Sequence, residues 1–166
     1  MKVVVEDANV LLDLVNGGVL GLWLGVELKN ITTHLVWEEV ARTHQRQEVQ
    51  PFIDSGLLIL NEIHPGSWEE ISRISNDCGV SISDASVWLI AKSEKAILLT
   101  GDSKLRKSAK AVGVEVRGVL WVLDELVVQE KLPPSAAVLA LDKMIEDGAF
   151  LPPEECRIRR AKWTAN

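Results

Sequence analysis

The stretch VVVEDANVLL, from Val3 to Leu12, decides how the chain begins to fold. Three β-branched residues predict a strand, yet Glu6, Asp7 and Asn9 follow at once, before apolar residues resume at helical spacing. Asp7 is then either a helix cap that accepts a backbone N–H, or a metal ligand at the end of a buried strand. Glu6 reads as a strand residue whose side chain points to the opposite side from Asp7.

Short apolar runs alternate with helical patterns along the chain. The predicted strands are Val3–Glu6, Asn30–Thr32, Leu57–Glu62, Ile97–Thr100 and Val114–Val116. This alternation predicts an α/β fold with a central, mostly parallel sheet of about five strands. Such sheets bind ligands beyond the carboxyl ends of their strands, and Asp7 and Asp102 each follow a predicted strand.

The sequence from residue 119 onward is helical in pattern. GVLWVLDELVVQE is amphipathic, and Pro133-Pro134 and Pro152-Pro153 open two further helical segments. This tail is too short to be a separate globular unit. We therefore predict one domain, in which residues 1–118 form the core and residues 119–166 form a helical C-terminal extension packed on it.

Composition narrows the function classes. The 166 residues carry a net charge of −6, whereas a protein that binds nucleic acid by neutralising phosphates over its whole surface is usually basic. If nucleic acid is the substrate, either cations bound to the protein or a local basic patch must therefore hold the phosphates. No run reaches the roughly 18 apolar residues of a membrane span, and no signal peptide is evident. Cys78 and Cys156 are interpreted as reduced thiols, which predicts a cytoplasmic protein. We expect no interaction with a membrane.

Four carboxylates stand at positions that suit a site. Asp7, Asp84 and Asp102 each lie near a predicted helix start, so each is also a plausible cap; Ser81 and Asp84 match the acidic variant of a capping box. Glu39 points toward the apolar side of the helix TTHLVWEEVART, where it needs a compensating partner unless its carboxylate reaches water.

Together the four acids indicate more than each does alone. Two like charges about 4 Å apart repel by roughly 4 kcal/mol at an effective dielectric of 20, so clustered carboxylates stay ionised only beside cations. Hard oxygen donors favour Mg²⁺ or Mn²⁺ over Zn²⁺. His34, His44 and His64 show no ligand spacing.

Other polar residues surround these acids in the sequence. Asn9 is a candidate to hold the metal ligands in position without binding the metal itself. Asp13, four residues later, is predicted to belong to a solvated helix face. Arg106, Lys107 and Lys110 share one predicted helical face, which is either solvated or placed to reach a phosphate beside Asp102.

The ordered set VVVEDANVLL, ITTHLVWEEV, SISDASVWLIA and AILLTGDSKLR resembles the PIN-domain family of metal-dependent ribonucleases, which includes VapC-type toxins. The likeness covers Lys2 to about Gly118, and the helical tail resembles a subgroup with a longer C-terminus. It implies a three-layer α/β/α fold in which Asp7, Glu39, Asp84 and Asp102 are the catalytic acids and metal ligands. Asn9 and Thr100 would then support those ligands.

The resemblance also implies an activity. Family members cut RNA at a phosphodiester with Mg²⁺ or Mn²⁺, leaving a 3′-hydroxyl and a 5′-phosphate. In many members another acid follows the fourth, but Ser103 and Lys104 occupy those places here. Ligation of a second metal is therefore in doubt, and either one or two ions are compatible with the sequence.

The resemblance further implies partners: an RNA substrate, a protein antitoxin and, as an option, a second copy of the chain. Trp23, Trp37, Trp121 and Trp163 either anchor such contacts or, as the more common role, fill the core. The basic cluster Arg157, Arg159, Arg160 and Lys162 either touches RNA or is a solvated end, and we favour the second.

Two alternatives remain at this point. A haloacid-dehalogenase-like phosphatase also begins with a strand ending in Asp, although Asp7-Ala8-Asn9 lacks its Asp-x-Asp motif. A PIN-like domain that has lost metal binding and serves as an interaction module is the other. The presence of all four acids argues against that loss.

Overall fold

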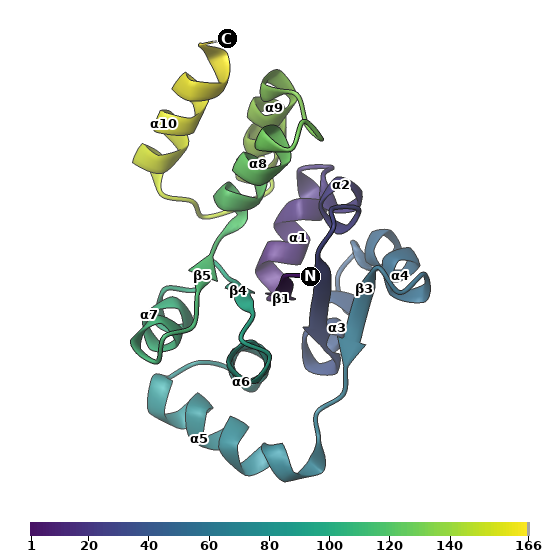
Figure 1. The fold of residues 1–166 in the computed structure, drawn as a ribbon, viewed down its shortest axis with the longest axis vertical. Helices are drawn as coiled ribbons and strands as arrows, with labels where there is room; N and C mark the ends of the chain where they lie inside the picture. Colours follow the sequence, from purple (N-terminus) through teal and green to yellow (C-terminus); the bar gives the residue numbers. More distant parts are fainter. Residues whose placement is uncertain (166) are drawn as a thin grey trace.

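The computed structural model describes residues 1–165; Asn166, the last residue of the predicted extension, lies outside the described residues. Within them, one parallel sheet has the strand order β3-β2-β1-β4-β5 (Figure 1). The strands are β1 (Val3–Glu6), β2 (Lys29–Thr33), β3 (Leu58–Asn61), β4 (Ile97–Leu99) and β5 (Val116–Arg117). The predicted α/β fold with a mostly parallel sheet of about five strands is confirmed.

Four of the five strand predictions have the wrong bounds. Asn30–Thr32 is one residue short at each end of β2, and Ile97–Thr100 runs one residue beyond β4. The other two differ as follows. Val114–Val116 was expected where β5 spans Val116–Arg117, because β5 pairs only with Leu98 and Leu99 of β4. Leu57–Glu62 was expected where β3 spans Leu58–Asn61, in register with residues of β2. In both cases the partner strand, rather than the apolar pattern, fixes where pairing stops.

Ten α-helices and one short 3₁₀ segment connect and follow the strands within residues 1–165. They are α1 (Ala8–Asn16), α2 (Leu20–Leu24), α3 (His34–Ala41), α4 (Arg46–Asp54), η1 (Pro65–Ser67), α5 (Trp68–Cys78), α6 (Ile82–Ser93), α7 (Ser103–Ala111), α8 (Val119–Val128), α9 (Pro134–Glu146) and α10 (Pro153–Thr164). None of these described helices is long and apolar enough to cross a membrane.

The strand order places a topological switch between β1 and β4. The chain leaves β1 toward β2 and β3 on one side, then returns to β4 and β5 on the other. Right-handed crossovers therefore put the two sets of connecting helices on opposite faces. Helices α5, α6 and α7 pack on one another, and α6 covers β1, β2 and β4. The crevice beyond the carboxyl ends of β1 and β4 is where such a fold binds ligands.

The C-terminal helices pack on the rest of the chain. Helix α8 contacts α1 and α2, and α9 contacts α1, while α10 lies at the periphery beside α9 (Figure 1). Trp23 of α2 is fully buried and meets Trp121 of α8 edge to face, with ring centroids 5.6 Å apart. Buried residues from both parts of the chain form one continuous core.

Candidate active site

Asp7 lies at the carboxyl end of β1 and begins α1. Its backbone N–H still pairs with the Leu99 carbonyl of β4, and its Oδ1 accepts the Ala8 N–H at 2.8 Å. The side chain is only 2% exposed, and Oδ2 accepts the Thr100 hydroxyl at 2.7 Å. Asp7 is therefore a helix cap, and it is also a buried carboxylate held between two neighbouring strands.

Thr100 connects the first acid to the fourth. Its hydroxyl donates to Asp7 and accepts the backbone N–H of Asp102 at 3.1 Å. Asp102 caps α7, with Oδ1 accepting the Leu105 N–H at 2.7 Å. The two acids after β1 and β4 thus share one buried hydroxyl, which fixes both of them at the switch point of the sheet.

Asp84 is positioned by a complete capping box at the start of α6. The Ser81 hydroxyl accepts the Asp84 N–H at 3.0 Å, and Asp84 Oδ2 accepts the Ser81 N–H at 3.1 Å. This leaves Oδ1 without a hydrogen bond among the described residues. As with Asp7, the capping interpretation holds, and it leaves a carboxylate oxygen available.

Glu39 approaches the same place from α3. Its carboxylate is exposed rather than directed into the core, and Oε2 accepts the Ser83 hydroxyl at 3.2 Å. Ser83 directly precedes Asp84. A second bond, at 2.9 Å, joins the hydroxyls of Ser86 in α6 and of Thr33, the residue that ends β2 and caps α3.

The charges of these acids act on Asp7. Burial raises the pKa of Asp7 to about 7; the Thr100 hydrogen bond opposes this, and the negative charges of Asp84 and Glu39 raise the pKa further. Asp7, Asp84 and Glu39 are therefore close enough to interact electrically. Within residues 1–165, however, no three acidic, histidine or cysteine side chains stand close enough together to hold a metal ion as they are.

The donor chemistry nevertheless fits Mg²⁺ or Mn²⁺. A carboxylate oxygen has two lone-pair sites, and each oxygen of Asp7 uses only one. Among the described residues, Asp84, Asp102 and Glu39 each keep one oxygen free of hydrogen bonds. Hard oxygen donors that repel one another favour a hard divalent cation. As metal ligands the four acids remain a prediction.

Two polar residues of α1 lie beside these acids. Asn9 and Asp13 both line a cavity that Thr100 and Asp102 also line. The prediction that Asp13 belongs to a solvated face is wrong, because its side chain is half-buried and burial raises its pKa to about 6. Their i, i+4 spacing already placed both on one face of α1, but it did not indicate that Asp13 would be half-buried while Asn9 stays exposed.

The three basic residues of α7 separate. Arg106 and Lys110 line the cavity, whereas Lys107 is exposed and lies outside its lining; contact of these three residues with RNA stays a prediction. Arg106 Nη1 donates to the Thr100 carbonyl at 3.0 Å. Its guanidinium is thereby fixed next to the strand end that carries Asp102.

Sequence reasoning missed the surroundings of Glu6. As expected, this residue does not join the acid cluster, but it is fully buried and its Oε1 accepts the Trp23 Nε1–H at 2.8 Å. Burial raises its pKa to about 7, the bond from Trp23 lowers it and the charge of Asp7 raises it. Within residues 1–165, Oε2 has no hydrogen-bond partner.

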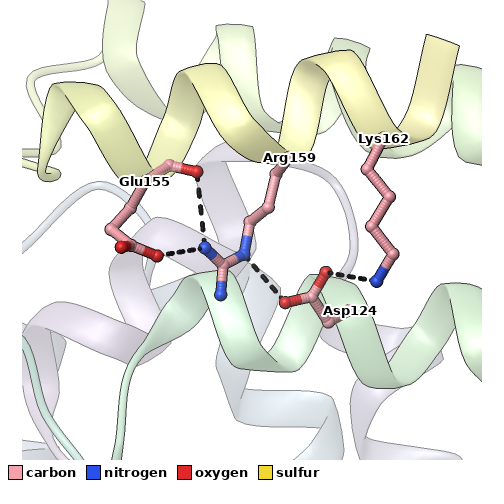
Figure 2. Close-up of polar contacts among 4 residues, drawn as sticks. All are labelled: Asp124, Glu155, Arg159 and Lys162. Atoms are coloured by element: carbon pink, nitrogen blue, oxygen red, sulfur yellow. Dashed lines mark hydrogen bonds and ion pairs between the residues drawn. The ribbon is translucent and has the colours of Figure 1, made fainter. Parts of the chain in front are cut away.

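The basic tail is neutralised by its own neighbours. Figure 2 shows Arg159 of α10 between Glu155 and Asp124, with Lys162 on the other oxygen of Asp124. Arg157 pairs with Glu154, and Arg160 pairs with Asp142 of α9. The pairs with Asp124 and Asp142 tie α10 to α8 and α9, a role that neither sequence interpretation of the cluster had named.

Most of the four tryptophans considered in the sequence analysis pack in or against the core, which is the more common of the two roles considered there. Trp23 and Trp163 are buried and Trp37 is packed against the core. Trp121 lines the cavity as well as contacting Trp23.

Comparison with known proteins identifies the family. A family model described as a PIN domain matches residues 3–164, and no curated protein matches. The protein PAE2754 from Pyrobaculum aerophilum is similar in structure, with a TM-score of 0.55 and 20% identity over 76% of this chain and 98% of that one. That likeness supports the fold alone. The haloacid-dehalogenase family is not the one that the match identifies. Because the family model spans nearly the whole chain, the helical extension included, this protein belongs to the PIN-domain family, which indicates a nuclease-type function.

Proposed function

We propose that this protein is a Mg²⁺- or Mn²⁺-dependent endoribonuclease that hydrolyses RNA phosphodiester bonds. The observation that carries the proposal is Asp7, a carboxylate that is 2% exposed and lies within the field of Asp84 and Glu39 at the switch point of the sheet. A buried acid whose pKa is raised by burial and by neighbouring negative charges is typical of functional sites.

Each acid has a role in this proposal. Asp7, Glu39, Asp84 and Asp102 would hold one or two divalent ions, and the bound metal would supply a low-pKa water and stabilise charge on the phosphate. Thr100 would orient Asp7 Oδ2 and the Asp102 backbone together. Ser83 would orient Glu39. A carboxylate not fully engaged by the cation could accept the proton of the attacking water.

The test is cleavage of single-stranded RNA with Mg²⁺ or Mn²⁺. We expect Asp7→Asn and Asp102→Asn each to lower the rate at least about 100-fold, because each removes a charge at the metal. Asp77→Asn, on the exposed side of α5, is the matched control and should cut at the wild-type rate. Wild-type rates in both site variants would show that the acids are wrongly assigned.

Calorimetry separates the enzyme from an inactive interaction module. Wild type should bind Mn²⁺ and Asp7→Asn should bind it more weakly. If the wild-type protein does not bind Mn²⁺ at millimolar concentration, the interaction module is favoured and the metal-dependent nuclease is rejected.

For the cellular role we propose a cytoplasmic toxin restrained by a protein antitoxin, on the strength of the resemblance to VapC-type proteins alone. Expression of the chain without a partner should then stop growth, and Asp7→Asn should relieve the arrest. A second copy of the chain remains a further candidate partner, to be tested by the mass of the protein in solution.

A further inference from the structure

A cavity of about 980 Å³ lies between the sheet end and the C-terminal helices. Thr100 and Asp102 form part of its wall, so it borders the candidate active site on the side of Asp102; Asp7, Glu39 and Asp84 do not line it. Its far wall is the α9–α10 connection and the first turns of α10. The volume is at the upper end of the roughly 300–1,000 Å³ usual for ligand pockets, so it has room for a nucleotide unit.

The charges of the cavity favour a phosphate chain. Glu155 and Arg159 pair with each other at 2.7 Å and cancel. Among the described residues, Arg106 and Lys110 form no ion pair with a carboxylate, and both face the cavity beside Asp102. Under the proposed function Asp102 would share its charge with a cation, so Asp13 is the one anion left to oppose a phosphate there.

The exposed aromatic side chain of Phe150 belongs to the cavity lining. Phe150 lines the cavity and is 99% exposed, so both faces of its ring are open. Two prolines, Pro152 and Pro153, follow it and restrict the backbone of the loop on that side. A single exposed apolar residue carries little meaning on its own. An open aromatic ring that lines the same cavity as two basic side chains is the combination that binds single-stranded nucleic acid.

We propose that this cavity binds the single-stranded RNA segment next to the scissile phosphate, with a base stacked on Phe150 and backbone phosphates on Arg106 and Lys110. This inference rests on the proposed function and deepens it, since it assigns the substrate path to the joint between the sheet and the C-terminal helices. Asn9 and Thr100 would lie where that path meets the acids.

Binding of a fluorescein-labelled single-stranded RNA of about 12 nucleotides, followed by fluorescence polarisation in the full-length Asp7→Asn protein, tests the proposal. Phe150→Ala should weaken binding about tenfold, whereas Phe150→Trp should retain it, because stacking on one aromatic ring contributes about that factor. The exposed Leu139 of α9, outside the cavity lining, provides the control Leu139→Ala, which should change nothing.

Charge variants add a second, independent readout. Lys110→Gln should weaken binding a few-fold and reduce the slope of log affinity against log salt by about 1, since one phosphate contact is lost. Asp13→Asn should tighten binding. Lys131→Gln, an exposed lysine outside the cavity lining, is the matched control and should leave both affinity and slope unchanged.

The two proposals fail in different ways. If the wild type cuts RNA but Phe150→Ala and Lys110→Gln bind RNA as tightly as the controls, the cavity is not the RNA path and a protein segment becomes the better occupant. If these variants weaken RNA binding but the wild type cuts no RNA with either metal, the proposal that the cavity binds RNA is supported. The proposal that the protein is a ribonuclease is then rejected. Unchanged thermal unfolding of Phe150→Ala should accompany either result, because the ring is exposed.

Discussion

At the scale of single residues, Asp7 shows that a capping role and a ligand role are compatible. One oxygen satisfies the first N–H of α1 and the other accepts the Thr100 hydroxyl, while each retains a lone-pair site. The fixed geometry comes from these two bonds. The tendency to attract a cation comes from the burial and from the neighbouring negative charges.

Thr100→Val should uncouple the two central acids. The valine keeps the shape but removes the donor to Asp7 and the acceptor for the Asp102 N–H, so the pKa of Asp7 should rise above its wild-type value. We expect a loss of about 1–2 kcal/mol in unfolding free energy and a loss of RNA cleavage. Urea denaturation and the cleavage assay measure these effects. Thr100→Ser, which restores the hydroxyl, should recover both.

Asp13 should make stability depend on pH. Its pKa rises from 3.8 to about 6 on folding because of burial, so the folded state holds the proton more tightly than the unfolded state. The resulting stabilisation is complete below pH 3.8 and is lost as pH rises through 6. Asp13→Asn should therefore be more stable than wild type at pH 8, by about 1–2 kcal/mol after allowing for the partial exposure of the group.

The measurement for Asp13 is urea denaturation from pH 4 to pH 8 in metal-free buffer. The difference between the variant and wild type in unfolding free energy should grow from pH 4 to about pH 6 and then level off. Asp77→Asn should show no such growth, and a pH-independent difference for Asp13→Asn would contradict the burial of its carboxylate.

At the scale of elements, three of the four predicted acids are positioned at the N-terminal ends of helices. Helices α1, α6 and α7 each begin at or next to one of the predicted acids. Helix α10 is held in a different way, by the ion pairs of Figure 2. Asp124 and Arg159 are each about 20% exposed, so their contact is screened less than a surface pair.

Arg159→Met should release α10. It leaves Asp124 with only the distant Lys162, at 3.9 Å, and should cost about 1–2 kcal/mol in unfolding free energy. Arg157→Met is the matched control on the same helix: its pair with Glu154 is well exposed, so the urea midpoint should not move. A double-mutant cycle with Asp124→Asn measures the coupling energy between Arg159 and Asp124. A value near zero would contradict the prediction that this ion pair holds α10 in place.

At the scale of the whole molecule, the C-terminal helices belong to the core. Leu123, Leu126, Leu141 and Met144 are fully buried, and α8 and α9 contact α1, which carries Asp13 and begins at Asp7. Burial of four such side chains contributes roughly 6–12 kcal/mol, which is comparable to the total stability of a domain.

A chain ending at Gly118 should therefore fail to unfold cooperatively, since Trp23 and the apolar side of α1 would be exposed. A chain ending at Leu151 keeps α8 and α9 and loses from the core only Cys156 and Trp163 of α10, so it should still unfold cooperatively at a lower temperature. Thermal unfolding followed by circular dichroism compares the two. Cooperative unfolding of the shorter chain would show that the core folds alone, and the division at residue 118 would then mark a true boundary.

The sequence alone determined the order of strands and helices, and it predicted which acids form the candidate site. β-branched runs followed by capping residues specify where strands and helices begin, because these preferences act between near neighbours. For the same reason the pattern could predict a parallel α/β fold and name Asp7, Asp84 and Asp102 as residues at element ends.

Only the tertiary structure decided which groups meet. Glu39 and Ser83 lie 44 residues apart in the chain, and Thr100 joins Asp7 across 93 residues; the packing of α3 on α6 and the pairing of β1 with β4 bring them together. The basic tail looked available in sequence, but α8 and α9 supply acids that neutralise it. Asp13 is half-buried and Phe150 is fully exposed for the same reason: what covers a side chain depends on distant elements, which no local pattern encodes.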